Sequence, residues 1–291
     1  MRTPSSWSVA VRRPDGEVSC VSNPISSPAS RRRWLRLPVI RGVVALVESL
    51  AIGFRALAIS ASVASAEEGE DGELTGELTR GQMAFAFAMA IGFTLIVFKV
   101  SPAILTDLLP IHSTIWFVLV EGLIRVSLLI GYLALISLIP DLRRVFQYHA
   151  AEHKAINAYE DGAELSPERV QTYSKIHPRC GTAFLLWVMV IAIFVFAFVG
   201  RPSLPMLILS RILLLPVIAG LAYELIRFGG KHPHNRIVRT LLAPGLWLQS
   251  LTTREPTLDQ VEVSINALRD VLQAEERSQA ERGLSRVEVM A

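Results

Sequence analysis

Residues 183–199 read AFLLWVMVIAIFVFAFV, an apolar run without a charged side chain. Helices that cross the hydrocarbon core of a bilayer have about 17–25 such residues. Three further stretches are similarly long and apolar, at 83–109, 114–139 and 206–228. Short loops join the first two stretches and the last two in chain order. The sequence therefore predicts an all-α polytopic membrane protein whose four transmembrane helices form two hairpins, 81–139 and 183–228.

The composition agrees with a membrane location. Of the 291 residues, 51% are hydrophobic and 19% are charged, whereas soluble domains carry about 25% charged residues. The mean hydropathy is +0.42. Two cysteines cannot build a disulfide framework, and residues 1–30 lack the apolar segment of a signal peptide. These features exclude a soluble enzyme, a disordered chain and a disulfide-stapled protein.

The basic residues indicate topology rather than nucleic-acid binding. The net charge is +3, but much of the excess lies in residues 31–41, directly beside an apolar stretch. The 140–182 loop and the segment after 228 are rich in Lys and Arg, whereas the two hairpin loops hold only Arg201. Because cytoplasmic loops carry the excess of Lys and Arg, we expect both termini and the 140–182 loop in the cytoplasm, and no nucleic-acid partner.

The apolar stretch at 39–66 is ambiguous, because Glu48 and Arg55 lie within it. An amphipathic helix that lies in the membrane interface, or packs against the bundle, fits this pattern better than a fifth span. A crossing here would also place the basic N-terminal segment on the other side of the membrane. We therefore expect no crossing.

The remaining segments are expected on the cytoplasmic side. Residues 1–38 contain a small β-hairpin, because apolar and polar residues alternate on both sides of the turn sequence Pro14-Asp15-Gly16. Residues 67–80 read as an acidic linker. Residues 229–291 form a C-terminal segment in which apolar residues recur at helical spacing from Thr257 to about Arg277, which predicts a cytoplasmic amphipathic helix.

The 140–182 loop contains the pattern H-x-x-E-H at His149, Glu152 and His153. The neighbouring Ala, Glu and Lys residues favour a helix, and a spacing of four residues places both imidazoles on one face. In such motifs two His nitrogens bind zinc and the Glu accepts a proton from water. The motif therefore predicts His149 and His153 as metal ligands and Glu152 as the general base.

Three residues further along the chain are candidates for the third ligand. His177 and Cys180 lie on a Pro/Gly turn directly before the third span. Glu224 lies near the end of the fourth span, where an ionisable residue indicates function. His232 and His234 follow on the same side. The sequence alone leaves the choice among His177, Cys180 and Glu224 open.

Each of these residues also has a purely structural interpretation. The two histidines of the motif could be hydrogen-bonded interfacial residues, or ligands of a metal that only ties the loop to the bundle. Glu224 could pair with Arg227 or Arg125, and Cys180 could be a small apolar residue. Glu121 and Arg125 are four residues apart and are interpreted as an ion pair within one helix rather than as a site.

Several segments together resemble one family. They are residues 1–4, 10–16, 41–50, 148–160, 177–182, 223–224 and 244–249. In these segments the chain is similar to the YqhQ-like family of bacterial integral membrane proteins, which have a domain of unknown function and are labelled predicted metal-dependent enzymes. The resemblance covers nearly the whole chain and implies a multi-pass protein of the bacterial inner membrane. The glycine-rich stretch that precedes Met-Arg-x-Pro in such proteins is not part of this sequence.

Two functions are compatible with these features of the sequence. The first is a metal-dependent hydrolase, with zinc as the expected ion, that acts at the cytoplasmic membrane face on a peptide or a lipid. The second is a membrane scaffold or assembly partner for another membrane protein, with or without a structural metal. A transporter is disfavoured, because no half-helix repeat is visible.

Overall fold

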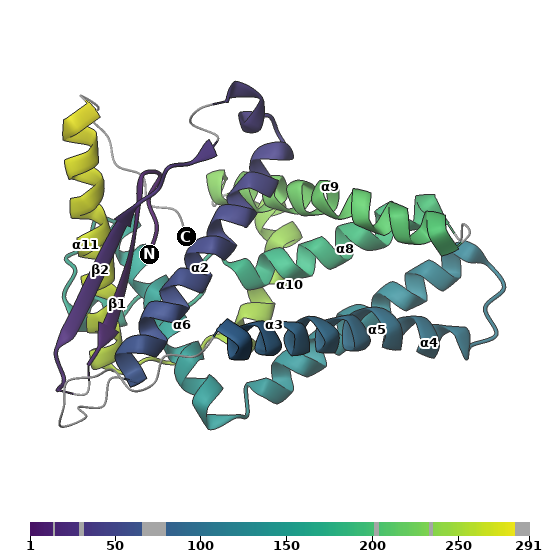
Figure 1. Ribbon diagram of the computed structural model, residues 1–291, viewed down its shortest axis with the longest axis horizontal. Coiled ribbons are helices and arrows are strands. Elements are labelled where there is room, and N and C mark those ends of the chain that lie inside the picture. The colour runs from purple at the N-terminus through teal and green to yellow at the C-terminus, as the bar shows by residue number, and fades with distance from the viewer. Residues whose placement is uncertain (14, 29–31, 66–79, 201–203, 233–234, 283–291) are drawn as a thin grey trace.

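The computed structural model describes residues 1–13, 15–28, 32–65, 80–200, 204–232 and 235–282. Residues 67–79 of the acidic linker, Pro14 and His234 therefore lie outside the described residues. The chain is mostly helical and has a single two-stranded antiparallel sheet among these residues. Figure 1 shows a bundle of long helices and, at one end of it, a smaller unit that contains the sheet.

Among the described residues, five helices are long and apolar enough to cross a membrane. Four of them coincide with the predicted spans, and the fifth is α2, for which we expected no crossing. Length and composition qualify α2 as a span but do not show on which side of the membrane its ends lie. The chain is thus a multi-pass membrane protein. The helices are α2 (Ile40–Ser65), α3 (Arg80–Leu95) with its continuation η2 (Ile96–Val100) and α4 (Ser101–Asp107), α5 (Thr114–Ile136), α8 (Gly181–Val199) and α9 (Leu204–Lys231).

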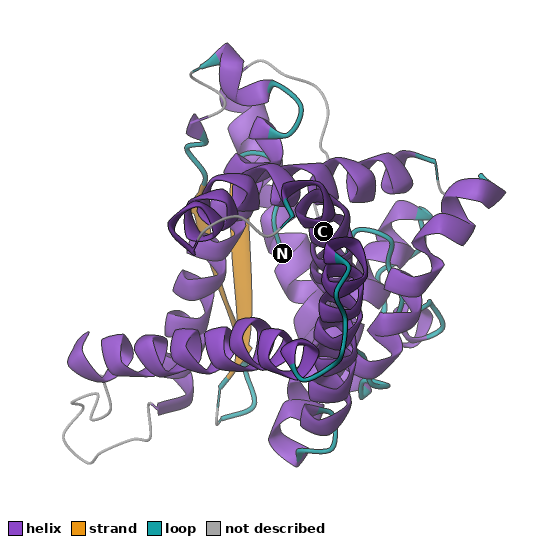
Figure 2. Cartoon of the chain, turned by 90° about the vertical axis from the view of Figure 1, so that its right-hand side faces the viewer, coloured by secondary structure: helices purple, strands orange, loops and turns teal. Residues whose placement is uncertain are grey.

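Within the bundle, α8 packs between α5 and α9. Figure 2 looks along this bundle, with the strands of the sheet behind it. The approach of α5 to α8 depends on Gly122, because a Cβ there would lie 2.3 Å from Cγ1 of Ile193. Glu121 and Arg125 are buried beside this contact and pair with each other, which confirms the predicted ion pair. Arg125 Nε also donates to the carbonyl of Phe98, at 3.0 Å, in the π-helical turn η2.

The smaller unit joins both ends of the chain to the loop between the two membrane hairpins. Strands β1 (Ser6–Arg12) and β2 (Val18–Pro24) confirm the predicted hairpin. They pack against α11 (Leu258–Arg282), which confirms the predicted C-terminal amphipathic helix and extends it. Helix α11 in turn packs against α6 (Pro140–Glu160). Their common core is formed by Ala151, Ala155, Ala158, Val170, Val261, Ile265, Leu268 and Val271.

Helix α10 (Arg236–Thr252) was not predicted, because Pro244 and Gly245 lie in its interior and both disfavour helices. Two features stabilise it. Asn235 caps its first turn, since the Asn235 Oδ1 accepts from the backbone N–H groups of residues 237 and 238. The fully buried Leu248 packs into the bundle core. The shorter helices are η1 (Arg33–Arg36) and α7 (Pro167–Gln171).

Candidate metal centre

Helix α6 carries the H-x-x-E-H motif, as predicted. It begins with Pro140 in its first turn and Asp141 beside it, both favourable at a helix N-terminus. Its alanines face α11, and small side chains allow the two helices to approach closely. The rings of His149 and His153 lie on another side of α6, with their centroids 4.4 Å apart.

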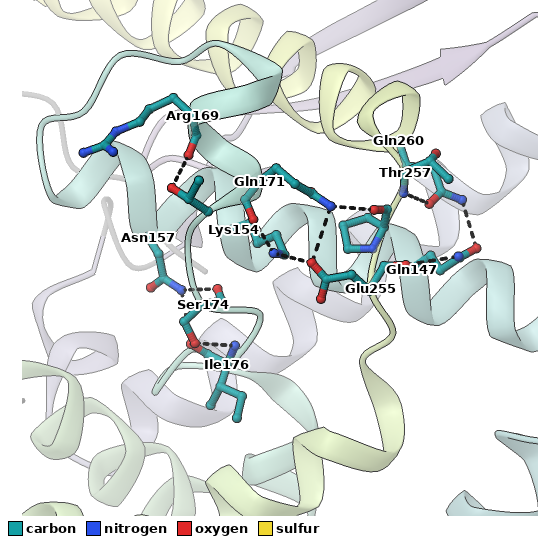
Figure 3. Close-up of polar contacts among 12 residues, drawn as sticks. Gln147, Lys154, Asn157, Arg169, Gln171, Ser174, Ile176, Glu255, Thr257 and Gln260 are labelled. Atoms are coloured by element: carbon teal, nitrogen blue, oxygen red, sulfur yellow. Dashed lines mark hydrogen bonds and ion pairs between the residues drawn. The ribbon is translucent and has the colours of Figure 1, made fainter.

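The loop that follows α6 is fastened back onto it by polar contacts, several of which Figure 3 shows. Lys154 is buried, donates to the carbonyl of Gln171 at 2.6 Å and pairs with Glu255 at 2.7 Å. The Asn157 side chain donates to the carbonyls of Ser174 and Ile176 at 2.8 and 3.1 Å. Because these contacts fix residues 171–176, the next turn of the chain meets the face of α6 that carries the histidines.

Three side chains converge at this point. One ligand atom from each of His149, His153 and Cys180 lies within 4.8 Å of the other two. Cys180 Sγ is 3.3 Å from His149 Nε2. His153 and Cys180 are only 3% and 4% exposed, whereas His149 is half-buried. The structure thus brings together both histidines of the motif and one of the three candidates for a third ligand.

The backbone holds both imidazoles in position. His149 Nδ1 lies 2.9 Å from the carbonyl of Thr252, and His153 Nδ1 lies 2.7 Å from the carbonyl of Lys175. A carbonyl only accepts, so each Nδ1 carries a proton and donates it. In the neutral ring the other nitrogen, Nε2, then keeps its lone pair. Metal-binding histidines in proteins have the same arrangement, in which a hydrogen bond at one nitrogen fixes the tautomer and orients the other.

Cys180 is acidified by its surroundings. Burial by itself raises the pKa of this thiol, but hydrogen bonds and positive charge from His149 and His153 outweigh burial and lower the pKa to about 5. For His149 the directions are reversed. Burial by itself lowers the pKa of this imidazole, but the hydrogen bond and the charge of Cys180 outweigh burial and raise the pKa to about 9. Cys180 is also the N-cap residue of α8, where the helix dipole favours a negative charge. The thiolate is the form of cysteine that binds metals.

His177 lies next to this cluster, with its ring centroid 5.8 Å from that of His153. Its Nδ1 accepts from the backbone N–H of Arg179 at 3.3 Å, and its Nε2 lies 3.5 Å from the Glu160 carboxylate. Burial, with the charge of His153, lowers its pKa to about 4, so the ring is neutral. Both nitrogens of His177 thus have partners outside the three-residue group.

Glu224 lies elsewhere, in α9, where Arg41 at the start of α2 binds its carboxylate. Arg41 Nε donates to Glu224 at 2.7 Å, and the second nitrogen of the guanidinium makes an ion pair. The backbone N–H of Val39 donates to the same carboxylate at 3.3 Å. Glu224 therefore fastens α2 to α9, and its partner is neither Arg227 nor Arg125.

Glu152 lies on the wall of a cavity of about 890 Å³ that His149 also lines. Its side chain is half-buried. Within the described part of the chain its carboxylate has no hydrogen bond or ion pair, although its charge acts on His149 and His177. The arrangement thus places an available carboxylate and His149 on one cavity wall, whereas His153 and Cys180 do not line this cavity.

The sequence analysis gave the residues of α10 no role in the site, although 244–249 is among the segments that carry the family resemblance. Gln249 is fully buried, and its side chain makes two hydrogen bonds to the backbone of His177. It accepts from the His177 N–H at 3.0 Å and donates to the His177 carbonyl at 2.9 Å. Thr252 supplies the carbonyl that orients His149. A polar glutamine directly after the apolar residues 246–248 was the available signal for Gln249, but the backbone carbonyls of Thr252 and Lys175 have no sequence signature.

Two comparisons place the chain among known sequences. It is 33% identical over 279 residues to the uncharacterized protein YqhQ of Bacillus subtilis (strain 168), an alignment that covers 93% of this chain and 88% of that protein. No solved structure matches the chain. A family model described as a protein of unknown function, DUF1385, matches residues 37–274, which include every residue of the cluster described above. The chain therefore belongs to the DUF1385 family of proteins of unknown function.

Proposed function

We propose that this protein is a membrane-bound, metal-dependent hydrolase. In this proposal His149, His153 and Cys180 hold one divalent ion and Glu152 is the general base. One observation carries it: three ligand atoms lie within 4.8 Å of one another, and both histidines are oriented by hydrogen bonds from Nδ1 to backbone carbonyls. Structural histidines need no such convergence.

The donor set is suited to zinc. Thiolate and imidazole are the ligands that zinc prefers, with bond lengths of about 2.3 and 2.0 Å, and ligand atoms separated by 3.3 Å, as in the pair of Cys180 and His149, can share one such ion. Catalytic zinc sites have three protein ligands and keep a fourth position open, whereas structural sites have four. The described residues supply three.

The surroundings of the cluster support a reaction rather than a purely structural metal. A zinc ion at this point would supply a Lewis acid that lowers the pKa of a bound water to about 7. Glu152 lines the same cavity as His149 and would take the proton from the attacking water. His149 and His153 would keep their Nδ1 protons on the carbonyls of Thr252 and Lys175 throughout, which preserves their orientation.

We further propose that the site faces the cytoplasm of a bacterial cell from its inner membrane, with both termini on that side. The support is the distribution of Lys and Arg, which are abundant in 140–182 and after 228 and nearly absent from the hairpin loops. The two parts of the structure agree with this arrangement, because the hairpin, α6 and α11 gather at one end of the bundle. An even number of crossings before residue 140 is required, so α2 would lie in the interface.

The first test is the metal content of the protein, purified in detergent and measured by elemental mass spectrometry. We expect close to one equivalent of zinc in the wild type and none above background in the His149→Ala/His153→Ala variant. His232→Ala is the matched control, because the Nδ1 of His232 also contacts a backbone carbonyl, that of Phe228, at 3.0 Å, yet this histidine lies outside the cluster. A wild type without metal would refute the proposal and favour the scaffold interpretation.

The second test separates a catalytic from a structural metal. Glu152→Gln removes the base and leaves all three ligands in place. The variant is expected to keep the metal and its thermal unfolding midpoint, and to lose hydrolysis of any substrate that the wild type cleaves. An active Glu152→Gln variant would contradict the role of Glu152 and leave the metal with a structural role.

A further inference from the structure

Three cationic side chains meet inside the membrane bundle. Lys99 belongs to the π-helical turn η2, Arg125 to α5 and Arg211 to α9. Lys99 and Arg211 each interact electrostatically with Arg125 and with Glu121, and Lys99 also interacts with Arg211. Among the described residues, Glu121 is the one carboxylate in this group. The four side chains therefore form a cluster with a formal excess of two positive charges.

Glu121 cannot neutralise all three cations. Its carboxylate pairs with Arg125 of the same helix, and both residues are buried. Lys99 and Arg211 make no hydrogen bond or ion pair within the described part of the chain. Both contact the buried ring of Phe196 in α8, whose centroid lies 5.7 Å from Lys99 Nζ and 3.6 Å from Arg211 Cζ. Two cations thus share one aromatic ring.

An aromatic ring does not take the place of a counter-ion in a bilayer. Charged side chains within membrane spans pair with one another or mark a functional site. The other carboxylates of the spans do not serve this cluster, because Glu48 and Glu224 each pair with an arginine elsewhere. Asp107 lies eight residues beyond Lys99 and is not among the charges that act on it. Within the described spans, no carboxylate remains to balance the two cations.

The cluster lies toward the hairpin-loop end of the bundle, away from the smaller unit (Figure 1). Glu121 and Arg211 each come seven residues after the first residue of their helices, α5 and α9. At 1.5 Å per residue this is a depth of about 10 Å, a third of a hydrocarbon core of about 30 Å. Phe196 is only three residues from the last residue of α8. Long cationic side chains reach toward the headgroups from such a depth.

The cluster is open on one side of the bundle. Lys99 is exposed, and its neighbours Ile96 and Val100 in the same turn are 60% and 47% exposed. In a membrane such an apolar face contacts hydrocarbon rather than water. A ligand with acyl chains can therefore reach Lys99 directly from the bilayer.

We propose that Lys99 and Arg211 bind the phosphate group of an anionic lipid, which approaches from the bilayer beside the Glu121–Arg125 pair. The ligand is anionic because the cluster has two positive charges in excess. Ammonium and guanidinium groups both bind phosphate oxygens through charge-assisted hydrogen bonds, and basic pockets between transmembrane helices bind lipid headgroups. This site is separate from the metal centre and does not rest on the proposed hydrolase function.

Arginines at the two ends of α9 supply a matched pair of variants. Arg211→Gln removes one of the two cations, whereas Arg211→Lys keeps the charge. Arg227→Gln is the control, because it changes the same type of residue sixteen positions further along the same helix. Arg227 lies near Glu224 rather than in the cluster. Lys99→Gln removes the second cation of the proposed site.

The first experiment measures the lipid that stays on the full chain after release from nanodiscs of phosphatidylglycerol and phosphatidylcholine in equal amounts. Native mass spectrometry identifies the retained lipid. We expect phosphatidylglycerol on the wild type, on Arg227→Gln and on Arg211→Lys. Arg211→Gln and Lys99→Gln are each expected to bind it about tenfold more weakly, as for the loss of one charge-assisted hydrogen bond. Retention by Arg211→Gln equal to that of the wild type would overturn the proposal.

A second experiment needs no variant and distinguishes a lipid from a free anion. The delipidated wild type in neutral detergent is titrated with phosphatidylglycerol, phosphatidylcholine or inorganic phosphate, and its thermal unfolding midpoint is followed. We expect a rise with phosphatidylglycerol alone. An equal rise with inorganic phosphate would assign the site to a free anion and overturn the lipid. Equal effects of the two lipids, or no effect of either, would overturn the role of charge and with it the proposal.

The lipid site and the metal centre can fail separately. Arg211→Gln leaves His149, His153 and Cys180 in place, so it is expected to hold zinc as the wild type does. The His149→Ala/His153→Ala variant keeps both cations of the bundle and is expected to retain phosphatidylglycerol. Loss of zinc in Arg211→Gln would show that its effect is a general loss of structure and would contradict a specific lipid site.

Discussion

Two of the buried polar clusters in the described part of the chain satisfy their polar groups in opposite ways. In the bundle, Glu121 and Arg125 neutralise each other, and Arg125 donates its remaining Nε–H to the carbonyl of Phe98. In the smaller unit, His149 and His153 each use one nitrogen on a backbone carbonyl. Their other nitrogens and the sulfur of Cys180 point to one another.

The difference separates a structural ion pair from a cluster that is prepared for a metal. Glu121 and Arg125 bind each other directly within one helix, and Lys99 and Arg211 are further cations that act on this pair. The histidine–cysteine cluster gathers three metal-binding atoms and no carboxylate within its own group. His149 and Cys180 also contact each other directly, but this cluster differs from the ion pair because three metal-binding atoms lie at one point. Variants in each cluster therefore test this comparison.

The largest effect is expected at Cys180. Cys180→Ala removes one of three ligand atoms and is expected to weaken zinc binding by more than about 100-fold, the upper end of what loss of an outer partner alone produces. The measurement is a competition titration against a chelating indicator. The control is Cys20→Ala, because Cys20 is exposed and lies in the hairpin, and it is expected to bind zinc as the wild type does. Equal loss in both variants would show that the effect is not specific to the cluster.

The Glu121–Arg125 pair is expected to behave in the opposite manner. Arg125→Leu leaves the buried Glu121 without its partner and is expected to lower the free energy of unfolding by about 3–5 kcal/mol. The double variant Glu121→Gln/Arg125→Leu removes both charges and is expected to recover most of that loss. Zinc content stays unchanged in both. Unfolding in mixed micelles followed by circular dichroism gives the comparison, and a double variant as unstable as the single one would show that the pair has a further partner.

Gln249→Leu is expected to have an intermediate effect that links the two parts of the molecule. The change puts an apolar side chain of similar size in place of the glutamine and removes both hydrogen bonds to the backbone of His177. Leaving these buried groups unsatisfied is expected to cost about 1–3 kcal/mol of stability. The turn that begins at His177 is then fixed less firmly, and Cys180 at its end is positioned less well. Zinc affinity is therefore expected to fall by about tenfold. Unchanged affinity in this variant would show that Cys180 is positioned by α8 alone.

Most of the elements could be predicted from the sequence, because their signals are local. Apolar runs predicted the four spans, and alternation predicted the β-hairpin. The Ala, Glu and Lys residues around the motif predicted α6, and helical spacing predicted α11. Helix α10 was not predicted because Pro244 and Gly245 are local signals against a helix, whereas the packing of Leu242 and Leu248 into the bundle is a tertiary effect.

The location of α2 could not be predicted for the same reason. An apolar composition with two internal charges is compatible with either a span or an interfacial helix. The ion pairs that hold α2 join it to distant parts of the chain, since Glu48 pairs with Arg2 and Arg41 pairs with Glu224. Neither partner can be recognised from the sequence of α2 itself.

The site was predictable only in part, because some of its contacts are local and others are not. The spacing of His149 and His153 on one helix face is local, and the sequence predicted it. The choice of Cys180 over His177 depends on which way a short turn faces, and Gln249 of a distant helix fixes that turn. Glu224 was attractive as a ligand because it is an ionisable residue in a span, but its partner Arg41 is 183 residues away in sequence.

The smallest effect is expected at Lys175, and it tests whether the orientation of His153 comes from the backbone. Lys175 contributes its carbonyl to His153 Nδ1 at 2.7 Å, and every residue that could replace it has the same carbonyl. Lys175→Ala is therefore expected to leave zinc affinity unchanged and to alter stability by no more than about 0.5 kcal/mol, as for other surface substitutions. The chelator competition used for Cys180 measures the affinity. A marked loss of zinc in Lys175→Ala would mean that the lysine side chain, rather than the backbone, orients the His153 ring. The contrast between a cluster of oriented ligands and a buried ion pair would then depend on His149 alone.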